Sequence, residues 1–292
     1  METAITRIKP RTNIRDFLNL AKARSIIPHV ITASAAMFLA AGGLPAGFTL
    51  LCTLTGGALA AAASNSLNCY FDRELDKQMV RTADRPLPSG RITPGQAMAF
   101  SAAAGLSGIL ILARFVNITA ALLTAGALVY YVVVYTALLK RRTWWSAVIG
   151  SGVGALTPLV GWAAVTDRLP PAPFVLSAII ILWTLPHYWS LAMYRKKDYA
   201  KAGLSVLPSR GAKIWIVLST MATAAATILL RFTAGLSMFY LVSTYLLGGV
   251  FIVLSLTVFR EKAAAAYRRL YIYSIIYVCL LFAVMIADKL FF

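Results

Sequence analysis

Acidic residues and cysteines are scarce in this sequence. Its 292 residues include only ten Asp and Glu, two His and three Cys. Cys52, Cys69 and Cys279 share no spacing typical of a zinc site or of a disulfide framework, so neither is expected to organise the fold. The segment before the first apolar run is about 25 residues long and has no small-residue cleavage site, which argues against a cleaved signal peptide.

Apolar side chains, in contrast, are in excess. They make up 60% of the chain, against roughly half in soluble domains, and runs of about 20 apolar residues recur along the whole sequence. The predicted fold class is an all-α integral membrane protein with a cytoplasmic N-terminal segment (1–25) and a single transmembrane domain (26–292). About nine transmembrane helices are predicted, over residues 26–45, 47–69, 96–115, 117–138, 145–165, 173–193, 213–231, 235–258 and 270–290.

The basic residues follow this pattern. A net charge of +18 would suggest a nucleic-acid partner in a soluble protein. Here 24 of the 28 Lys and Arg fall before the first run or after an even-numbered one. By the positive-inside rule this places the N-terminus in the cytoplasm and the C-terminus outside. The charge therefore indicates topology in a lipid bilayer, and no nucleic-acid partner is expected.

The N-terminal segment bears on localisation. A mitochondrial transit peptide is rich in Arg and Ser and nearly free of acids. This segment has only one serine, Ser25, and carries Glu2 and Asp16. We therefore expect a bacterial inner membrane rather than a mitochondrial one.

Four of the ten acids crowd into one stretch after the second apolar run: Asp72, Glu74, Asp76 and Asp84. Asn68, Asp72 and Asp76 are spaced four residues apart, and each such step turns a helix by about 40° and advances it about 6 Å. The three oxygen-bearing side chains would thus form one stripe. Mg²⁺ prefers such oxygen ligands and completes its shell with substrate phosphate.

Cations follow the stripe directly. Lys77, Arg81 and Arg85 are suited to phosphate oxygens, arginine in bidentate fashion. The simpler interpretation is a solvated loop in which Asp72 and Asp76 pair with Arg73 and Lys77, and for an isolated D-x-x-x-D it is the better one. The adjoining sequence favours the diphosphate site.

That adjoining sequence carries a resemblance to a known family. The spacing Asn68, Asp72, Asp76 is followed by Met79, Arg81, Thr82, Arg85, Pro86, Leu87, Pro88 and Gly90. This pattern resembles the signature of the UbiA-type intramembrane prenyltransferase superfamily. Residues 135–143, 150–162 and 186–208 are most similar to its protohaem farnesyltransferase subfamily.

The resemblance implies a UbiA-like bundle, with 26–292 as the prenyltransferase domain. The implied reaction is transfer of a farnesyl group from farnesyl diphosphate to a vinyl group of protohaem (haem B), giving haem O and diphosphate. The implied cofactor is Mg²⁺, and haem A synthase or terminal oxidase assembly factors are implied partners. Residues expected to hold the metal and act in catalysis are Asn68, Asp72, Asp76 and Asp198. Residues expected to contact substrate are Lys77, Arg81, Arg85, Tyr135, Lys140, Arg141, His187, Tyr194 and Arg195.

The roles of Asp198 and His187 are less fixed by the sequence than the others. Many relatives have a second aspartate pair, whereas here Asp198 stands alone with Lys201 near the second place. His187, between Trp183 and Trp189, is expected to position haem as an axial ligand or through a propionate, since histidine is a common haem ligand. A packing histidine is the alternative, and His29 is the competing candidate.

Two rival functions remain at this point. The first is the same chemistry on another lipophilic acceptor, such as a quinone precursor. The second is a transporter in which the aspartates bind a coupling cation. Such sites usually lie near the bilayer midplane, whereas these acids lie at a membrane edge among cations.

Overall fold

The computed structural model describes residues 13–79, 82–139, 146–196, 211–260 and 264–292, and every regular element within these ranges is helical. The predicted all-α fold class is confirmed. In chain order the elements are α1 (Ile14–Leu20), α2 (Ala23–Ala41), α3 (Gly47–Gln78), α4 (Pro94–Phe115), α5 (Ile118–Val129), the π-helical η1 (Tyr130–Leu139), α6 (Ser146–Thr166), α7 (Pro171–Tyr194), α9 (Ala212–Ala234), α10 (Met238–Arg260) and α11 (Ala264–Phe291).

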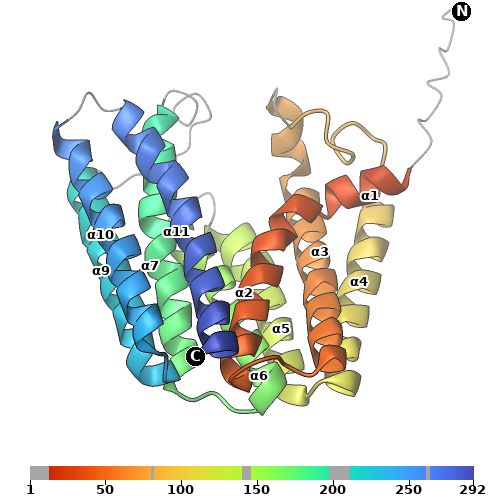
Figure 1. Ribbon diagram of the computed structural model, residues 1–292. Helices are drawn as coiled ribbons and strands as arrows, with labels where there is room; N and C mark the ends of the chain where they lie inside the picture. Colours follow the sequence, from red (N-terminus) through yellow and green to blue (C-terminus); the bar gives the residue numbers. More distant parts are fainter. Residues whose placement is uncertain (1–12, 80–81, 140–145, 197–210, 261–263) are drawn as a thin grey trace, which may run out of the picture.

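Nine helical spans among the described residues are long and apolar enough to cross a membrane, one for each predicted span. In Figure 1 they run between the two ends of a bundle, with α3 and α4 on one side and α7, α9, α10 and α11 on the other. The short helix α1 lies across one end, which we call the α1 end, and the C-terminus lies at the opposite end. The nine candidate spans of the described residues are an odd number, which agrees with α1 and the C-terminus lying at opposite ends of the bundle.

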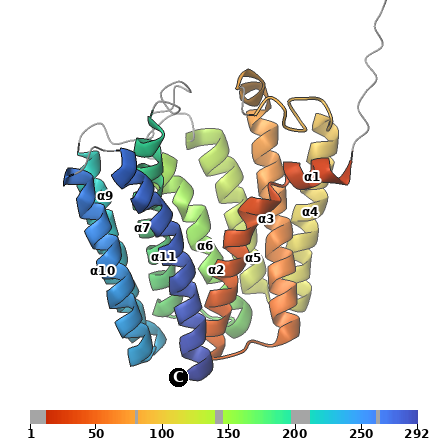
Figure 2. The same cartoon turned by 45° about the horizontal axis from the view of Figure 1, so that its top comes forward.

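Three elements differ from the sequence prediction. Helix α3 continues nine residues beyond the predicted end, as a single helix through Gln78. The segment predicted as one helix over 117–138 is α5 followed by η1. Helix α1 was not predicted, and it lies inside the N-terminal segment. Figure 2 shows it crossing in front of α3 and α4. Its apolar residues Ile14 and Leu18 are 79% and 55% exposed, which suits a helix at a membrane surface.

Small residues let α3 and α4 approach closely. A Cβ atom at Gly56 would lie 2.8 Å from the Leu112 Cγ and 2.9 Å from the Gly108 carbonyl oxygen. Close contact between small residues is the usual basis of helix packing in membranes. Gly57 is different, because a Cβ atom there meets nothing within 4 Å. One glycine of the pair therefore serves packing, and its neighbour borders open space.

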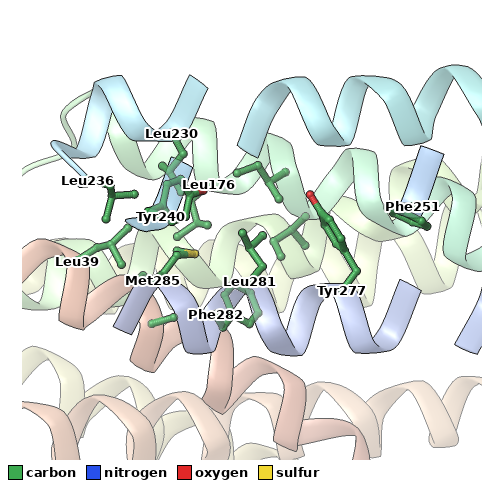
Figure 3. Packing of buried hydrophobic residues seen from close by; sticks show 14 of the residues in the cluster. Leu39, Leu176, Leu230, Leu236, Tyr240, Phe251, Tyr277, Leu281, Phe282 and Met285 are labelled. Atoms are coloured by element: carbon green, nitrogen blue, oxygen red, sulfur yellow. The ribbon is translucent and has the colours of Figure 1, made fainter. Parts of the chain in front are cut away.

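The other side of the bundle is filled by large side chains. Figure 3 shows buried residues of α2, α7, α9, α10 and α11 meeting in one apolar cluster. Tyr240 and Tyr277 lie fully buried within it. Tyr240 donates a hydrogen bond to the Thr227 carbonyl at 2.8 Å, and the Tyr277 hydroxyl lies 3.1 Å from Thr227 Oγ1. The phenol hydroxyls are thus satisfied inside the membrane, where an unpaired polar group is costly.

Candidate active site

The predicted oxygen stripe exists and faces the bundle interior. Asn68, Asp72 and Asp76 all lie on α3 and are 2%, 4% and 4% exposed. The three stay on one face because α3 remains a continuous helix past its apolar part. Asp72 and Asp76 are buried on a helix, whereas the alternative requires them to be exposed in a loop. The loop alternative is therefore wrong for these residues.

Asn68 joins α3 to two other segments. Its Oδ1 accepts a hydrogen bond of 2.6 Å from Lys22 Nζ, and its Nδ2 donates to Thr136 Oγ1 at 3.3 Å. Lys22 lies between α1 and α2, and Thr136 lies on η1. These two contacts fix which way the amide points, with its oxygen on the Lys22 side.

Asp76 is held from the segment that follows α3. Arg85 Nη1 donates to Asp76 Oδ2 at 2.7 Å, in an ion pair whose arginine side chain is 32% exposed. The Thr82 hydroxyl donates to the Asp76 main-chain carbonyl at 3.0 Å. The predicted phosphate ligand Arg85 is therefore brought to the stripe.

A second ion-pair cluster holds the outside of this segment. Arg91 pairs with Asp84 at 2.9 Å and with Asp16 of α1 at 3.0 Å. The hydrogen bond that Arg91 donates to Asp84 raises the pKa of the Arg91 guanidinium. The side chain of Asp84 is 94% exposed, so this acid belongs to the support of the site rather than to the stripe.

Lys77 is not brought to the stripe. It follows Asp76 by one residue, which turns it about 100° around the helix. Its ammonium instead lies 3.0 Å from Glu74 Oε2 on the exposed face of α3. Four other predicted residues lie outside the described residues: Arg81, Lys140, Arg141 and Asp198.

A cavity of about 320 Å³ opens beside the stripe, between α2, α3, α5, η1 and α6. Along α3 its lining extends from Asn65 to Thr53, which is about 18 Å of helix. Its polar side chains at the stripe end include Lys22, Ser25 and Asn65. The remaining wall is mostly apolar and built from small residues, including Ala33, Gly57, Ala58, Ala60, Ala61 and Gly150.

Two tyrosines of η1 lie near the cavity. Tyr131 lines it, and its ring stacks on Tyr135 with 5.4 Å between centroids. The Tyr135 ring packs so closely on Gly150 that a Cβ atom there would lie 2.7 Å from Cε2. The predicted substrate contact Tyr135 is therefore packed beside the cavity wall.

His187 lies elsewhere, on the seam between α7 and α11. Its ring stacks on Trp183 (4.7 Å between centroids) and tilts against Tyr271 (4.9 Å). Its Nδ1 lies 2.8 Å from Ser274 Oγ, and Ser274 Oγ donates to the Tyr271 carbonyl at 2.6 Å. Because that hydroxyl has one hydrogen, it accepts from Nδ1–H, which leaves the lone pair on Nε2.

The end of α7 carries two further predicted residues. Arg195 is exposed, and its guanidinium lies 5.5 Å from the centre of the half-buried Tyr194 ring. The other histidine, His29, does line the cavity, with Nδ1 3.1 Å from Thr157 Oγ1. Sequence reasoning missed this placement and also that of Lys22, because each depends on contacts between distant segments.

Comparison with known proteins places these features in a family. Residues 29–285 match the model of the UbiA prenyltransferase family. The chain is 40% identical to the protoheme IX farnesyltransferase of Roseiflexus castenholzii, over 99% of this chain and 54% of that protein. It therefore spans about half the length of that relative. It is 39% identical to the protoheme IX farnesyltransferase of Symbiobacterium thermophilum, over 97% of this chain and 96% of the other.

Solved structures give the same fold. The chain superposes on digeranylgeranylglyceryl phosphate synthase with a TM-score of 0.82 at 17% identity, covering 94% of this chain and 98% of the other. It superposes on a UbiA homologue from Archaeoglobus fulgidus bound to GPP and Mg²⁺ with a TM-score of 0.61 at 17% identity, covering 92% and 99%. At these identities the likeness establishes the fold alone.

Proposed function

Because this chain belongs to the UbiA prenyltransferase family, we propose that it transfers a farnesyl group from farnesyl diphosphate to a vinyl group of protohaem. The observation that carries this proposal is a buried oxygen stripe meeting an apolar cavity at Lys22. Such a junction suits a substrate with a charged head and a hydrocarbon tail. The choice of farnesyl and protohaem rests on the names of relatives about 40% identical over nearly the whole chain.

The stripe fits a magnesium ion. Within the described residues there is no cluster of three or more His, Cys, Asp or Glu side chains that would hold a metal unaided. Asn68, Asp72 and Asp76 provide two carboxylates and an amide, and Mg²⁺ commonly takes few protein ligands and substrate phosphate. Asp198 is proposed as a further ligand. When bound, Mg²⁺ would neutralise charge on the diphosphate.

The protein's own groups account for the rest of the proposed reaction. Arg85 stands at the stripe, where it would bind a phosphate oxygen. The remaining proposed phosphate ligands are Lys77, Arg81, Lys140, Arg141 and Arg195, and reaching the phosphate would require Lys77 to leave Glu74. As the allylic carbon–oxygen bond breaks, its electron pair stays on the diphosphate and the farnesyl chain becomes a cation. The apolar cavity would keep water from that cation.

Completion of the product follows from the acceptor. The vinyl π electrons form the new carbon–carbon bond, and a water molecule adds to the resulting cation and releases one proton. The product is the hydroxyethyl farnesyl group of haem O. Tyr135 and Tyr194 are proposed to contact substrate at the α1 end.

His187 is proposed to position the haem. A histidine that binds a metal usually has its other nitrogen fixed by a hydrogen bond. Ser274 fixes Nδ1, and the Trp183 and Tyr271 rings both pack against the imidazole. The Nε2 lone pair is then directed by a rigid ring, as an axial ligand to iron requires.

The setting of the enzyme is also proposed. The chain is a multi-pass membrane protein by its nine candidate spans among the described residues. We propose the bacterial inner membrane, with the α1 end in the cytoplasm, and residues 26–292 as one prenyltransferase domain. Haem A synthase or terminal oxidase assembly factors are the partners that this product would suit.

The decisive experiment uses the purified full chain with farnesyl diphosphate, Mg²⁺ and haem B. Mass spectrometry of the extracted haem should show haem O, and diphosphate should appear in equal amount. Omitting Mg²⁺ should stop both. Prenylation of a phenolic acceptor instead of haem would overturn the acceptor assignment, and diphosphate release with neither acceptor nor haem product would overturn transferase activity.

A further inference from the structure

Lys22 occupies a built position between α1 and α2. Its backbone is left-handed, with φ 50° and ψ 52°, a conformation that non-glycine residues adopt rarely and mostly under constraint from surrounding structure. The constraint is visible. Asn65 of α3 donates to the Ala21 carbonyl at 2.9 Å and to Ser25 Oγ at 3.0 Å, and the Ser25 hydroxyl donates to the Lys22 carbonyl at 2.8 Å.

This bend directs the Lys22 side chain toward Asn68. Its ammonium donates to Asn68 Oδ1 at 2.6 Å, and the same side chain lines the cavity. Lys22 therefore both donates to the oxygen stripe and lines the cavity wall. Asn65 already joins this bend to α3 through the Ala21 carbonyl and the Ser25 hydroxyl, and the Lys22 ammonium adds a separate contact at the stripe.

The position matters because of where the breaking bond must lie. If the stripe holds the diphosphate and the cavity holds the prenyl chain, the oxygen that joins them lies at the junction, where Lys22 is. We propose that Lys22 donates a hydrogen bond to this bridging oxygen and stabilises the charge that develops on it. This inference rests on the proposed function, and it assigns a catalytic residue 46 positions away from the acidic motif.

Cleavage of the bond requires no reactant beyond the prenyl diphosphate itself. The bond between the allylic carbon and the bridging oxygen breaks, and its electron pair stays on that oxygen. Lys22 supplies a hydrogen bond from its ammonium and keeps its proton. Asn68 Oδ1 keeps the ammonium beside the stripe; because this oxygen has two lone pairs, it can accept from Lys22 with one and bind the metal ion with the other. A group of this kind acts mainly in the transition state, because the charge on the bridging oxygen grows only as the bond breaks.

The test compares Lys22→Met, Lys22→Arg and a control, Lys213→Met. Lys213 lies at the start of α9, with its Nζ 5.8 Å from the Phe259 ring, away from the cavity lining. Three quantities are measured for each purified protein: thermal unfolding, binding of unreactive farnesyl thiodiphosphate with Mg²⁺, and single-turnover release of diphosphate. Release is measured with haem and also without it, when slow hydrolysis reports bond cleavage alone.

For Lys22→Met we expect thiodiphosphate affinity within about threefold of the parent and cleavage slowed by about 10²- to 10³-fold, the usual effect of losing one such donor. Lys22→Arg should recover part of the rate, and Lys213→Met should match the parent. Unchanged cleavage in Lys22→Met would overturn the proposal. So would a loss of thiodiphosphate affinity or stability as large as the loss of rate, which a merely structural lysine would give. If the parent cleaves without haem but forms no haem product, the proposed acceptor fails while the hydrolysis arm still decides the role of Lys22.

Discussion

Gly57 offers a direct test of whether the cavity holds the prenyl chain. It lies on α3 in the cavity lining, and a Cβ atom there meets nothing within 4 Å. Gly57→Leu should therefore place its side chain in the cavity without disturbing the helix contacts. Gly56, one residue earlier, has no such room, because a Cβ atom there lies 2.8 Å from Leu112.

The expected magnitude follows from the space lost. The four carbons of a leucine side chain displace about one five-carbon isoprene unit, and each buried CH₂ is worth about 0.8 kcal/mol on transfer from water. The loss is then up to about 4 kcal/mol, or about 10³-fold in kcat/KM for farnesyl diphosphate. This is an upper bound, since a chain that arrives from lipid gains less from the cavity. Geranyl diphosphate, one unit shorter, should be used almost as well as before.

The assay is kcat/KM for farnesyl and geranyl diphosphate in the same preparation, reported as a ratio. Gly249→Leu is the matched control, because Gly249 is an exposed residue of α10 where a Cβ atom also meets nothing within 4 Å. The control should leave the ratio unchanged. An unchanged ratio in folded Gly57→Leu would refute the assignment of the prenyl chain to this cavity.

Three further results are expected. Asp72→Asn and Asp76→Asn should each slow transfer at least about 100-fold, since replacing even the residues that support metal ligands lowers activity about 10- to 100-fold. Asp84→Ala should have a milder effect because its carboxylate is exposed. Near-normal turnover of the first two variants at limiting Mg²⁺ would contradict the metal site. His187→Ala should keep farnesyl thiodiphosphate binding and weaken haem binding, measured by the haem absorption spectrum; normal haem affinity and conversion would remove His187 from the site. A reporter fused after Phe292 should signal outside the cytoplasm, and a cytoplasmic signal would show that the number of crossings is even.

Composition and the regular spacing of residues were enough to predict part of this fold. The nine spans follow from apolar runs, and the Asn68, Asp72, Asp76 stripe follows from four-residue spacing on a helix. The position of Lys77 was also within reach of helix geometry, because one residue beyond Asp76 turns about 100° away from the stripe. Proximity in sequence favoured Lys77, and the structure places it with Glu74 instead.

The junction at Lys22 was beyond sequence reasoning for a different reason. In the sequence Lys22 is one of six basic residues before the first apolar run, and the positive-inside rule accounts for the presence of all six. Its left-handed backbone depends on Asn65, more than 40 residues away. Helix α1 was missed because seven residues are too few to give a hydropathy signal, and His29 because cavity walls are assembled from several helices.

The number of residues in each turn of η1 sets the directions in which its side chains point. In its π-helical turns each hydrogen bond spans five residues, and the Thr136 hydroxyl reaches the Tyr131 carbonyl five positions back. Thr136 therefore faces Asn68 while Tyr131 lines the cavity. Removing one residue from this stretch would break the five-residue spacing that sets Thr136 toward Asn68 and Tyr131 toward the cavity. The spacing of η1 is thus a register setting, and a deletion there should harm the site more than replacing Tyr135.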